Sequence, residues 1–167
     1  FTIQWVITLN QSAILVHLLP QQSEYTADAV FNMASQKGGA LITLERNNSL
    51  DQYAERAINL NSDITRELLE QIFIKDSPLH DGGIIIQGDK ITSAGAVFPT
   101  SDSMKISKRL GTRHRAGLGM AKETDSIIII VSEESGKISV AKEGKLIIDI
   151  EEDNLRQMLL KNFETKD

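Results

Sequence analysis

The most constraining feature of this sequence is an apolar run from Ser126 to Val131, which reads SIIIIV. Four consecutive isoleucines and a valine leave no polar face, so a strand built from them needs cover on both sides. Such a run is typical of a central strand in a sheet that has helices on both of its faces. We therefore expect a layered α/β structure around this strand.

Shorter apolar segments predict the rest of the sheet at residues 40–44, 83–87, 91–98, 137–141 and 145–150, with turns at Gly88-Asp89 and Glu143-Gly144. Helical spacing predicts helices at 28–36, 63–74 and 151–163, the second capped by Asn61 or Ser62. Residues 105–122 have helical character interrupted by Gly111, residues 46–63 read as a polar connection, and residues 3–19 as a hairpin or a strand leading into a helix. Hairpin-like pairs coexist with long crossovers, which predicts an α/β class: a single domain with a central mixed β-sheet flanked by helices.

Length and composition limit the domain organisation. A chain of 167 residues fits one domain, which we assign to residues 21–167, and residues 1–20 form an N-terminal segment whose role the sequence does not define. The apolar stretch from Trp5 to Leu19 is broken by polar residues and is shorter than the roughly 20 residues of a membrane span. The absence of cysteine excludes disulfides and thiolate metal sites.

Positive charge is concentrated in one window of this acidic chain. Residues 103–122 contain no Asp or Glu but six Lys or Arg, and since the whole chain carries −5, the remainder carries −11. The window includes Gly111-Thr112-Arg113-His114-Arg115, in which the glycine can restart a helix. Free N–H groups at a helix start and arginine side chains both bind phosphate, so we favour a phosphate site over a merely solvated basic face.

A second candidate stretch is His80-Asp81-Gly82-Gly83, at the start of a predicted strand. Neighbouring side chains on a strand point to opposite faces, so the histidine and the carboxylate must lie on the preceding turn to reach one ligand. Imidazole and carboxylate suit Mg²⁺ or Mn²⁺ already held by phosphates, and glycine lets the backbone approach a bulky group. An ordinary polar turn explains the same spacing.

A third candidate, Ser132-Glu133-Glu134-Ser135-Gly136, directly follows the central apolar run. Polar groups at the end of a buried strand are where α/β proteins place ligands, although a simple hairpin turn is equally consistent with the spacing. The chain lacks GxxxxGK[ST] and a GxGxxG motif after a strand, so the common nucleotide-binding folds are not expected.

Together, LHDGG, GTRHRAG and VSEESG, in this order and at these spacings, resemble the diadenylate cyclase (DAC) domain, which makes cyclic di-AMP from two ATP. The resemblance runs from about Tyr25 to Phe163 and is most similar to the membrane-associated bacterial branch. The family usually has alanine where this chain has Gly83, and we expect glycine to be tolerated there.

The resemblance implies roles for individual residues. Asp81 would position metal and activate the ribose 3′-hydroxyl of one ATP, His80 would be a metal ligand, and Gly82 would let the backbone approach the nucleotide. Arg113 and His114 would act in catalysis at the triphosphate, and Phe98 would contact adenine. The remaining implied ATP-binding residues are Gly111, Thr112, Arg115, Ser132 and Glu134.

The resemblance further implies a metal-dependent enzyme, using Mn²⁺ or Mg²⁺, whose active site forms between two face-to-face subunits of a homodimer and releases two pyrophosphate. The expected location is the cytoplasm, with membrane attachment only through segments outside this chain. One alternative is a catalytically silent module that senses ATP or cyclic di-AMP. Another is an RNA-binding module, but nucleic acid is not an expected partner, because an aromatic content of 5% provides few stacking platforms.

Overall fold

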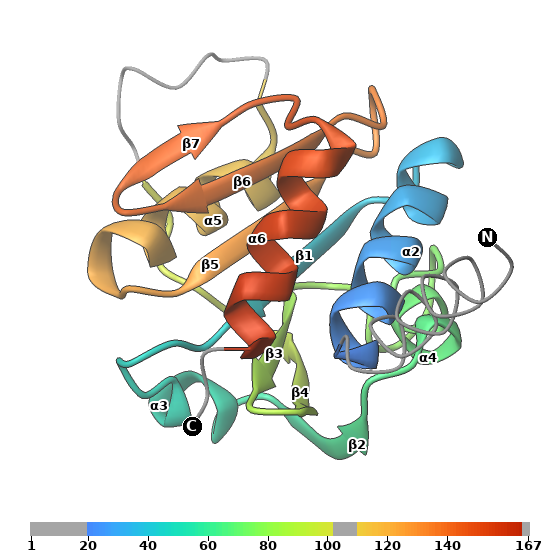
Figure 1. The fold of residues 1–167 in the computed structure, drawn as a ribbon. Helices are drawn as coiled ribbons and strands as arrows, with labels where there is room; N and C mark the ends of the chain where they lie inside the picture. Colours follow the sequence, from blue (N-terminus) through green and yellow to red (C-terminus); the bar gives the residue numbers. More distant parts are fainter. Residues whose placement is uncertain (1–19, 102–109, 165–167) are drawn as a thin grey trace, which may run out of the picture.

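The computed structural model describes residues 20–101 and 110–164. Its centre is a seven-stranded sheet with the strand order β2-β4-β3-β1-β5-β6-β7 (Figure 1). The strands are β1 (Ala40–Leu44), β2 (Ile58–Asp63), β3 (Gly83–Gln87), β4 (Lys90–Ala96), β5 (Ile127–Val131), β6 (Ile138–Lys142) and β7 (Lys145–Ile147). β1 and β3 pair in parallel and the other neighbours pair antiparallel, so the predicted mixed sheet is confirmed.

The apolar run that predicted a central strand is β5, which lies between β1 and β6 and is fully buried. Its side chains alternate between two cores. Ile127, Ile129 and Val131 belong to one cluster, and Ile128 and Ile130 belong to the other. Each core is a sheet face closed by helices, which explains why the run needs no polar side.

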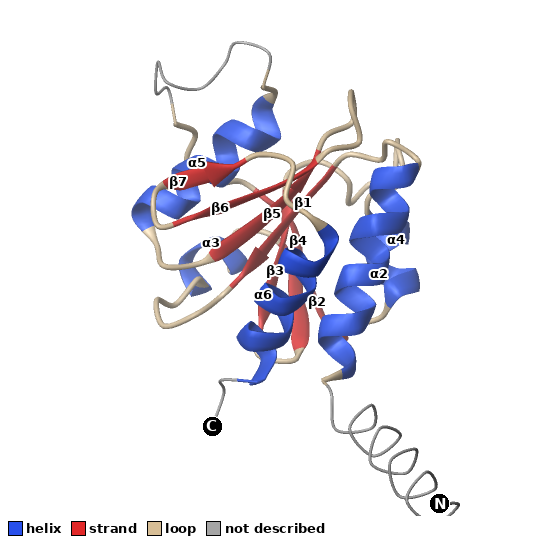
Figure 2. Cartoon of the chain, turned by 45° about the horizontal axis from the view of Figure 1, so that its top comes forward, coloured by secondary structure: helices blue, strands red, loops and turns tan. Residues whose placement is uncertain are grey.

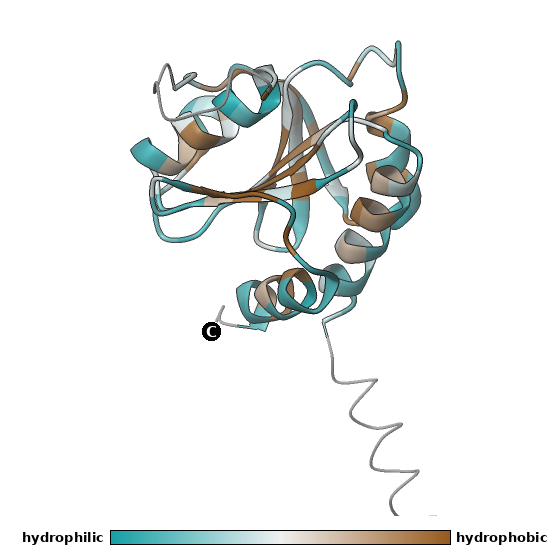
Figure 3. Cartoon of the chain, turned by 90° about the horizontal axis from the view of Figure 1, so that it is seen from above, coloured by the Kyte–Doolittle hydropathy of each residue, from teal (hydrophilic) through white to brown (hydrophobic). Residues whose placement is uncertain are grey.

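Within the described residues, five helices cover the two faces of the sheet (Figure 2). The first core packs under α2 (Gln21–Ser35), α4 (Arg66–Ile72) and α6 (Glu152–Glu164), whereas the second packs under α3 (Asp51–Ala54) and α5 (Thr112–Glu123). Figure 3 shows hydrophobic residues concentrated along the strands between these layers. Arg156 of α6 joins α2 through ion pairs of 3.2 Å to Glu24 and 3.0 Å to Asp28.

The structure corrects several predicted boundaries. The helix predicted at 28–36 begins earlier, at Gln21, and the strands predicted to end at 98 and 150 end at Ala96 and Ile147. Residues 46–63 contain α3 and β2 rather than only a connection. β2 was missed because it is a largely exposed edge strand without an apolar signature.

The predicted start of α4 was also wrong. Asp63 ends β2, and the helix is capped by Thr65 rather than by Asn61 or Ser62. The Thr65 hydroxyl accepts the Leu68 N–H at 3.1 Å, which satisfies one of the free donors of the first turn. The segments predicted at 3–19 and 105–109 lie outside the described residues. Among the residues that are described, no helix is long and apolar enough to cross a membrane.

Candidate functional site

The three candidate motifs meet at one edge of the sheet. β1 and β3 begin at this edge, and β4 and β5 end there, as the pairs Ala40–Val131 and Gly83–Ala96 show. The His80-Asp81-Gly82 turn therefore precedes β3 close to the point where the Ser132–Gly136 turn follows β5. Only the start of β1 lies between them, so the two turns are two strand spacings apart, about 10 Å.

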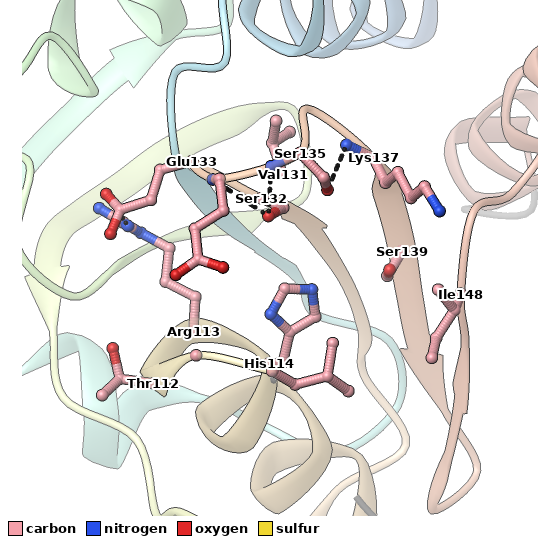
Figure 4. Close-up of a pocket in the computed structure, with 13 residues that line it drawn as sticks. Thr112, Arg113, His114, Val131, Ser132, Glu133, Ser135, Lys137, Ser139 and Ile148 are labelled. Carbon is pink, nitrogen blue, oxygen red and sulfur yellow. Dashed lines mark hydrogen bonds and ion pairs between the residues drawn. The ribbon is translucent and has the colours of Figure 1, made fainter. Parts of the chain in front are cut away.

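A cavity of about 450 Å³ opens beside this edge, between the start of α5 and the turn that joins β5 to β6 (Figure 4). Its wall carries both charged side chains and the apolar side chain of Ile148. The lining residues are Leu110, Gly111, Thr112, Arg113, His114, Val131, Ser132, Glu133, Glu134, Ser135, Lys137, Ser139 and Ile148.

The start of α5 gives the cavity an anion-binding character. The helix begins at Thr112, and its N-cap, Gly111, has an extended backbone and no side chain to accept the first N–H groups. The first turn also contains no acidic residue. Helix starts of this kind leave N–H donors and a partial positive charge for a ligand, which suits phosphate.

Arg113 is held in the cavity wall before any ligand is present. Its Nη1 lies 3.1 Å from Oε2 of Glu133, and its side chain is only 20% exposed (Figure 4). Its Nε is buried and has no hydrogen-bond partner within the described part of the chain. A buried donor without an acceptor is costly, so Arg113 carries an unsatisfied hydrogen-bonding group beside the cavity that it lines.

His114 follows on the buried side of α5 and extends towards the β5–β6 turn (Figure 4). Burial lowers the pKa of its imidazole, the positive charge of Arg113 lowers it further, and Glu134 raises it in part. The imidazole is therefore neutral at pH 7. A neutral imidazole contributes a hydrogen bond to the cavity but no charge.

The His80–Asp81 pair lies on the turn before β3, as the sequence predicted. Nδ1 of His80 lies 2.6 Å from the Ser77 carbonyl oxygen and donates to it, which leaves Nε2 as the basic nitrogen. Nε2 lies 3.3 Å from Oδ1 of Asp81, whose side chain is 95% exposed. Two donor atoms on one cation lie about 3 Å apart, so this pair fits two positions of a divalent metal.

Two glycines next to this pair are required by close contacts. At Gly82, φ is +79° and an added Cβ would lie 2.4 Å from the Ala96 carbonyl oxygen, so no other residue fits without a shift. At Gly83, an added Cβ would lie 2.6 Å from Cε2 of Phe98. The Phe98 ring thus fills the space that an alanine methyl would need, which explains why glycine is accommodated in this chain.

The other predicted residues are placed as follows. Phe98 is buried and packs edge-on against Tyr53, with ring centroids 5.8 Å apart, and does not line the cavity. Ser132 lines the cavity, while its hydroxyl accepts the N–H groups of Glu134 and Ser135 and so also shapes the turn. Arg115 is half-buried outside the lining.

Sequence reasoning missed five lining residues, Leu110, Val131, Lys137, Ser139 and Ile148. Lys137 immediately precedes β6 and Ser139 lies within it, so their two-residue spacing places both on one face of the strand. That period was readable in the sequence. The pairing of β6 with β5, which turns this face towards α5, could not be predicted from the sequence, because it depends on the order of strands in the sheet.

Comparisons with known proteins agree on one family. A family model described as DisA bacterial checkpoint controller nucleotide-binding (DAC) matches residues 27–146. A diadenylate cyclase of Listeria monocytogenes (strain 10403S) is 50% identical over 133 residues, which cover 80% of this chain and 49% of that protein. The cyclic di-AMP synthase CdaA of Bacillus subtilis (strain 168) is 45% identical over 141 residues, covering 84% of this chain and 52% of that protein.

A solved structure shows the same architecture. The crystal structure of a double cysteine mutant of DacA from Staphylococcus aureus superposes with a TM-score of 0.84 at 45% identity, covering 86% of this chain and 95% of that one. The chain spans about half the length of the two relatives above.

Proposed function

Because the chain belongs to the diadenylate cyclase (DAC) family, we propose that it condenses two ATP into 3′,5′-linked cyclic di-AMP with release of two pyrophosphate. One observation carries this proposal. The His80–Asp81 pair and the turn after β5, whose Glu133 pairs with Arg113 of α5 at 3.1 Å, lie at the same sheet edge, with the two turns about 10 Å apart. A polyphosphate site and a metal-binding carboxylate at that spacing could both contact one bound nucleoside triphosphate.

The triphosphate is proposed to bind at the start of α5. Gly111 and Thr112 are exposed and no side chain caps the start of the helix, and Arg113 brings a buried donor that has no acceptor among the described residues. Arginine and helix N–H groups oppose the charge that develops on phosphate oxygens in the transition state, which is where most catalysis of phosphoryl transfer lies. His114, Arg115, Ser132 and Glu134 are proposed to complete this part of the site.

The reacting end is proposed to lie at Asp81. Its exposed carboxylate is free to accept a hydrogen bond from a ribose 3′-hydroxyl and orient that oxygen towards the α-phosphorus of a second ATP. A bond then forms between this oxygen and phosphorus, the bond to pyrophosphate breaks, and the hydroxyl proton passes to the carboxylate or to water.

The residues at this end fit a divalent cation. His80 Nε2 and Asp81 Oδ1 are the proposed ligands, and Mn²⁺ or Mg²⁺ held there would neutralise charge on the phosphates. Within the described residues, no group of three or more His, Asp or Glu side chains converges on one point. The pair alone therefore makes an incomplete site, as expected for a metal that arrives with a nucleotide.

Two subunits are proposed to build the complete active site. Each chain offers one start of α5 and one Asp81, whereas the reaction needs two ATP facing each other. A two-fold axis through the sheet edge would bring two copies of the site together, so a monomer is expected to be inactive. We place this catalysis in the cytoplasm, with membrane attachment through segments outside the chain.

The reaction is tested by incubating the purified chain with ATP and either Mn²⁺ or Mg²⁺ and separating the products by anion exchange with mass detection. The proposal predicts cyclic di-AMP and pyrophosphate in a ratio of about one to two, as the mass balance of the reaction requires. ATP that stays intact with either metal, although it binds and the chain dimerises, would contradict it and favour a nucleotide sensor.

A further inference from the structure

Gly39, the residue before β1, lies against the Arg113 side chain. An added Cβ at this position would lie 2.5 Å from Nη1 and 2.9 Å from Cζ of Arg113, and 3.1 Å from Cβ of Glu133. Gly39 is buried and is not among the glycines with positive φ, so its backbone conformation is open to other residues. The glycine is therefore needed for the space it leaves and not for its backbone freedom.

That space receives the guanidinium. Arg113 rests against the Gly39 backbone on one side, and Glu133 holds Nη1 at 3.1 Å on another. Both neighbours belong to the same sheet edge. Gly39 leads into β1, Glu133 follows β5, and these two strands pair antiparallel. Both contacts are at the Nη1 end of the guanidinium, so they restrict the orientation in which it meets a ligand.

The same arrangement leaves Nε of Arg113 buried without an acceptor among the described residues. A guanidinium held by its neighbours in a cavity wall, with one donor unsatisfied, is suited to bind an anion. A phosphate in the cavity would be bound by the guanidinium donors that Arg113 presents to it.

We propose that Gly39 is a positioning residue for the triphosphate site at the start of α5. It leaves the room that lets Arg113 present its donors in one orientation. This inference rests on the proposed function, because it takes the ligand to be the triphosphate of a nucleotide. A side chain at residue 39 would push the guanidinium away from the sheet edge and break its pairing with Glu133.

The test measures binding of inorganic tripolyphosphate and of ATP by titration calorimetry, with adenosine as a probe that has no phosphate. Gly39→Ala is expected to weaken both polyphosphate ligands by about tenfold or more, the value of a lost charge-assisted hydrogen bond, and to leave adenosine unchanged. Gly38→Ala is the matched control, because its added Cβ would make only ordinary contacts of 3.6 Å or longer. It is expected to bind like the wild type.

A double-mutant cycle separates positioning from a general structural effect. In an Arg113→Ala background, Gly39→Ala is expected to change tripolyphosphate binding by less than about twofold, because the group it displaces is gone. An equal loss in both backgrounds would overturn the proposal, as would unchanged binding in Gly39→Ala alone. If Gly39→Ala does not fold, a folded Gly39→Ala/Arg113→Ala double variant supports the steric contact between the two residues. A double variant that also does not fold contradicts it.

These outcomes are distinct from failure of the proposed function. Wild-type chain that makes cyclic di-AMP while Gly39→Ala binds tripolyphosphate normally refutes only the role of Gly39. If the wild-type chain makes no product but Gly39→Ala still weakens tripolyphosphate binding as predicted, the reaction is refuted and the anion site is retained.

Discussion

Nε2 of His80 lies 3.3 Å from Oδ1 of Asp81, while Nδ1 of the same ring is held at 2.6 Å by the Ser77 carbonyl oxygen. The backbone contact fixes which ring nitrogen is basic and directs it to the carboxylate. A second hydrogen bond of this kind is the usual way in which proteins orient a metal-binding histidine.

From this pair we predict that His80→Ala raises the Mn²⁺ concentration needed for half-maximal product formation by at least about tenfold, because one of two protein ligands is lost. The measurement is a Mn²⁺ titration at fixed ATP. Tripolyphosphate binding without metal should be unchanged, since His80 does not line the cavity. An unaltered Mn²⁺ midpoint would show that His80 is not a ligand.

The buried imidazole of His114 predicts a dependence of stability on pH. Its pKa is lowered in the folded chain, chiefly by burial, so the unfolded chain takes up a proton first as the pH falls below 6.5. Folded-state stability is therefore lost on acidification, by at most about 1.4 kcal/mol per pH unit for one proton. Urea unfolding of wild type and His114→Gln between about pH 7.5 and 5.5 should show a shallower decline in the variant. Parallel curves would contradict this.

The contact between Gly83 and Phe98 predicts that Gly83→Ala is destabilising. The new methyl would lie 2.6 Å from the ring and 3.1 Å from the Leu41 side chain, and overpacking of this kind costs about 1–3 kcal/mol of unfolding free energy. Adding Phe98→Leu should restore part of the loss in urea unfolding, because the smaller side chain gives room. A Gly83→Ala variant as stable as the wild type would show that the ring moves freely.

If the active site forms between two subunits, specific activity depends on protein concentration. Product formed per chain should rise with concentration and level off once the dimer is populated. Sedimentation over the same range identifies the species present. Constant activity per chain in samples that sediment as monomer would rule out the shared site.

The parts of the fold that the sequence predicted are those whose signal is local. The run at β5 is buried on both faces, so its apolar residues alone indicated a central strand. β2 gave no such signal. It is an outermost strand with largely exposed residues, and it pairs with β4, which comes later in the chain. Thr65 was missed as a cap because Asn61 and Ser62 have the same capping chemistry, and only the extent of β2 decides between them.

The candidate site was predictable to a similar degree. The basic window, the His80–Asp81 turn and the turn after β5 stood out by residue type, and both turns and the start of α5 within that window lie at one sheet edge. The contact of Gly39 with Arg113 was not readable, because it joins residues from the start of β1 and the start of α5. Such contacts follow from strand order, which no local pattern encodes.

The role of Asp81 in the reaction is tested by comparing Asp81→Asn with Asp89→Asn in the formation of cyclic di-AMP from ATP. Both residues are exposed aspartates next to β3, but Asp89 lies in the turn at the opposite end of that strand. If Asp81 orients the 3′-hydroxyl, Asp81→Asn abolishes product while the fold is retained, and Asp89→Asn has wild-type activity. Full activity in Asp81→Asn would contradict it.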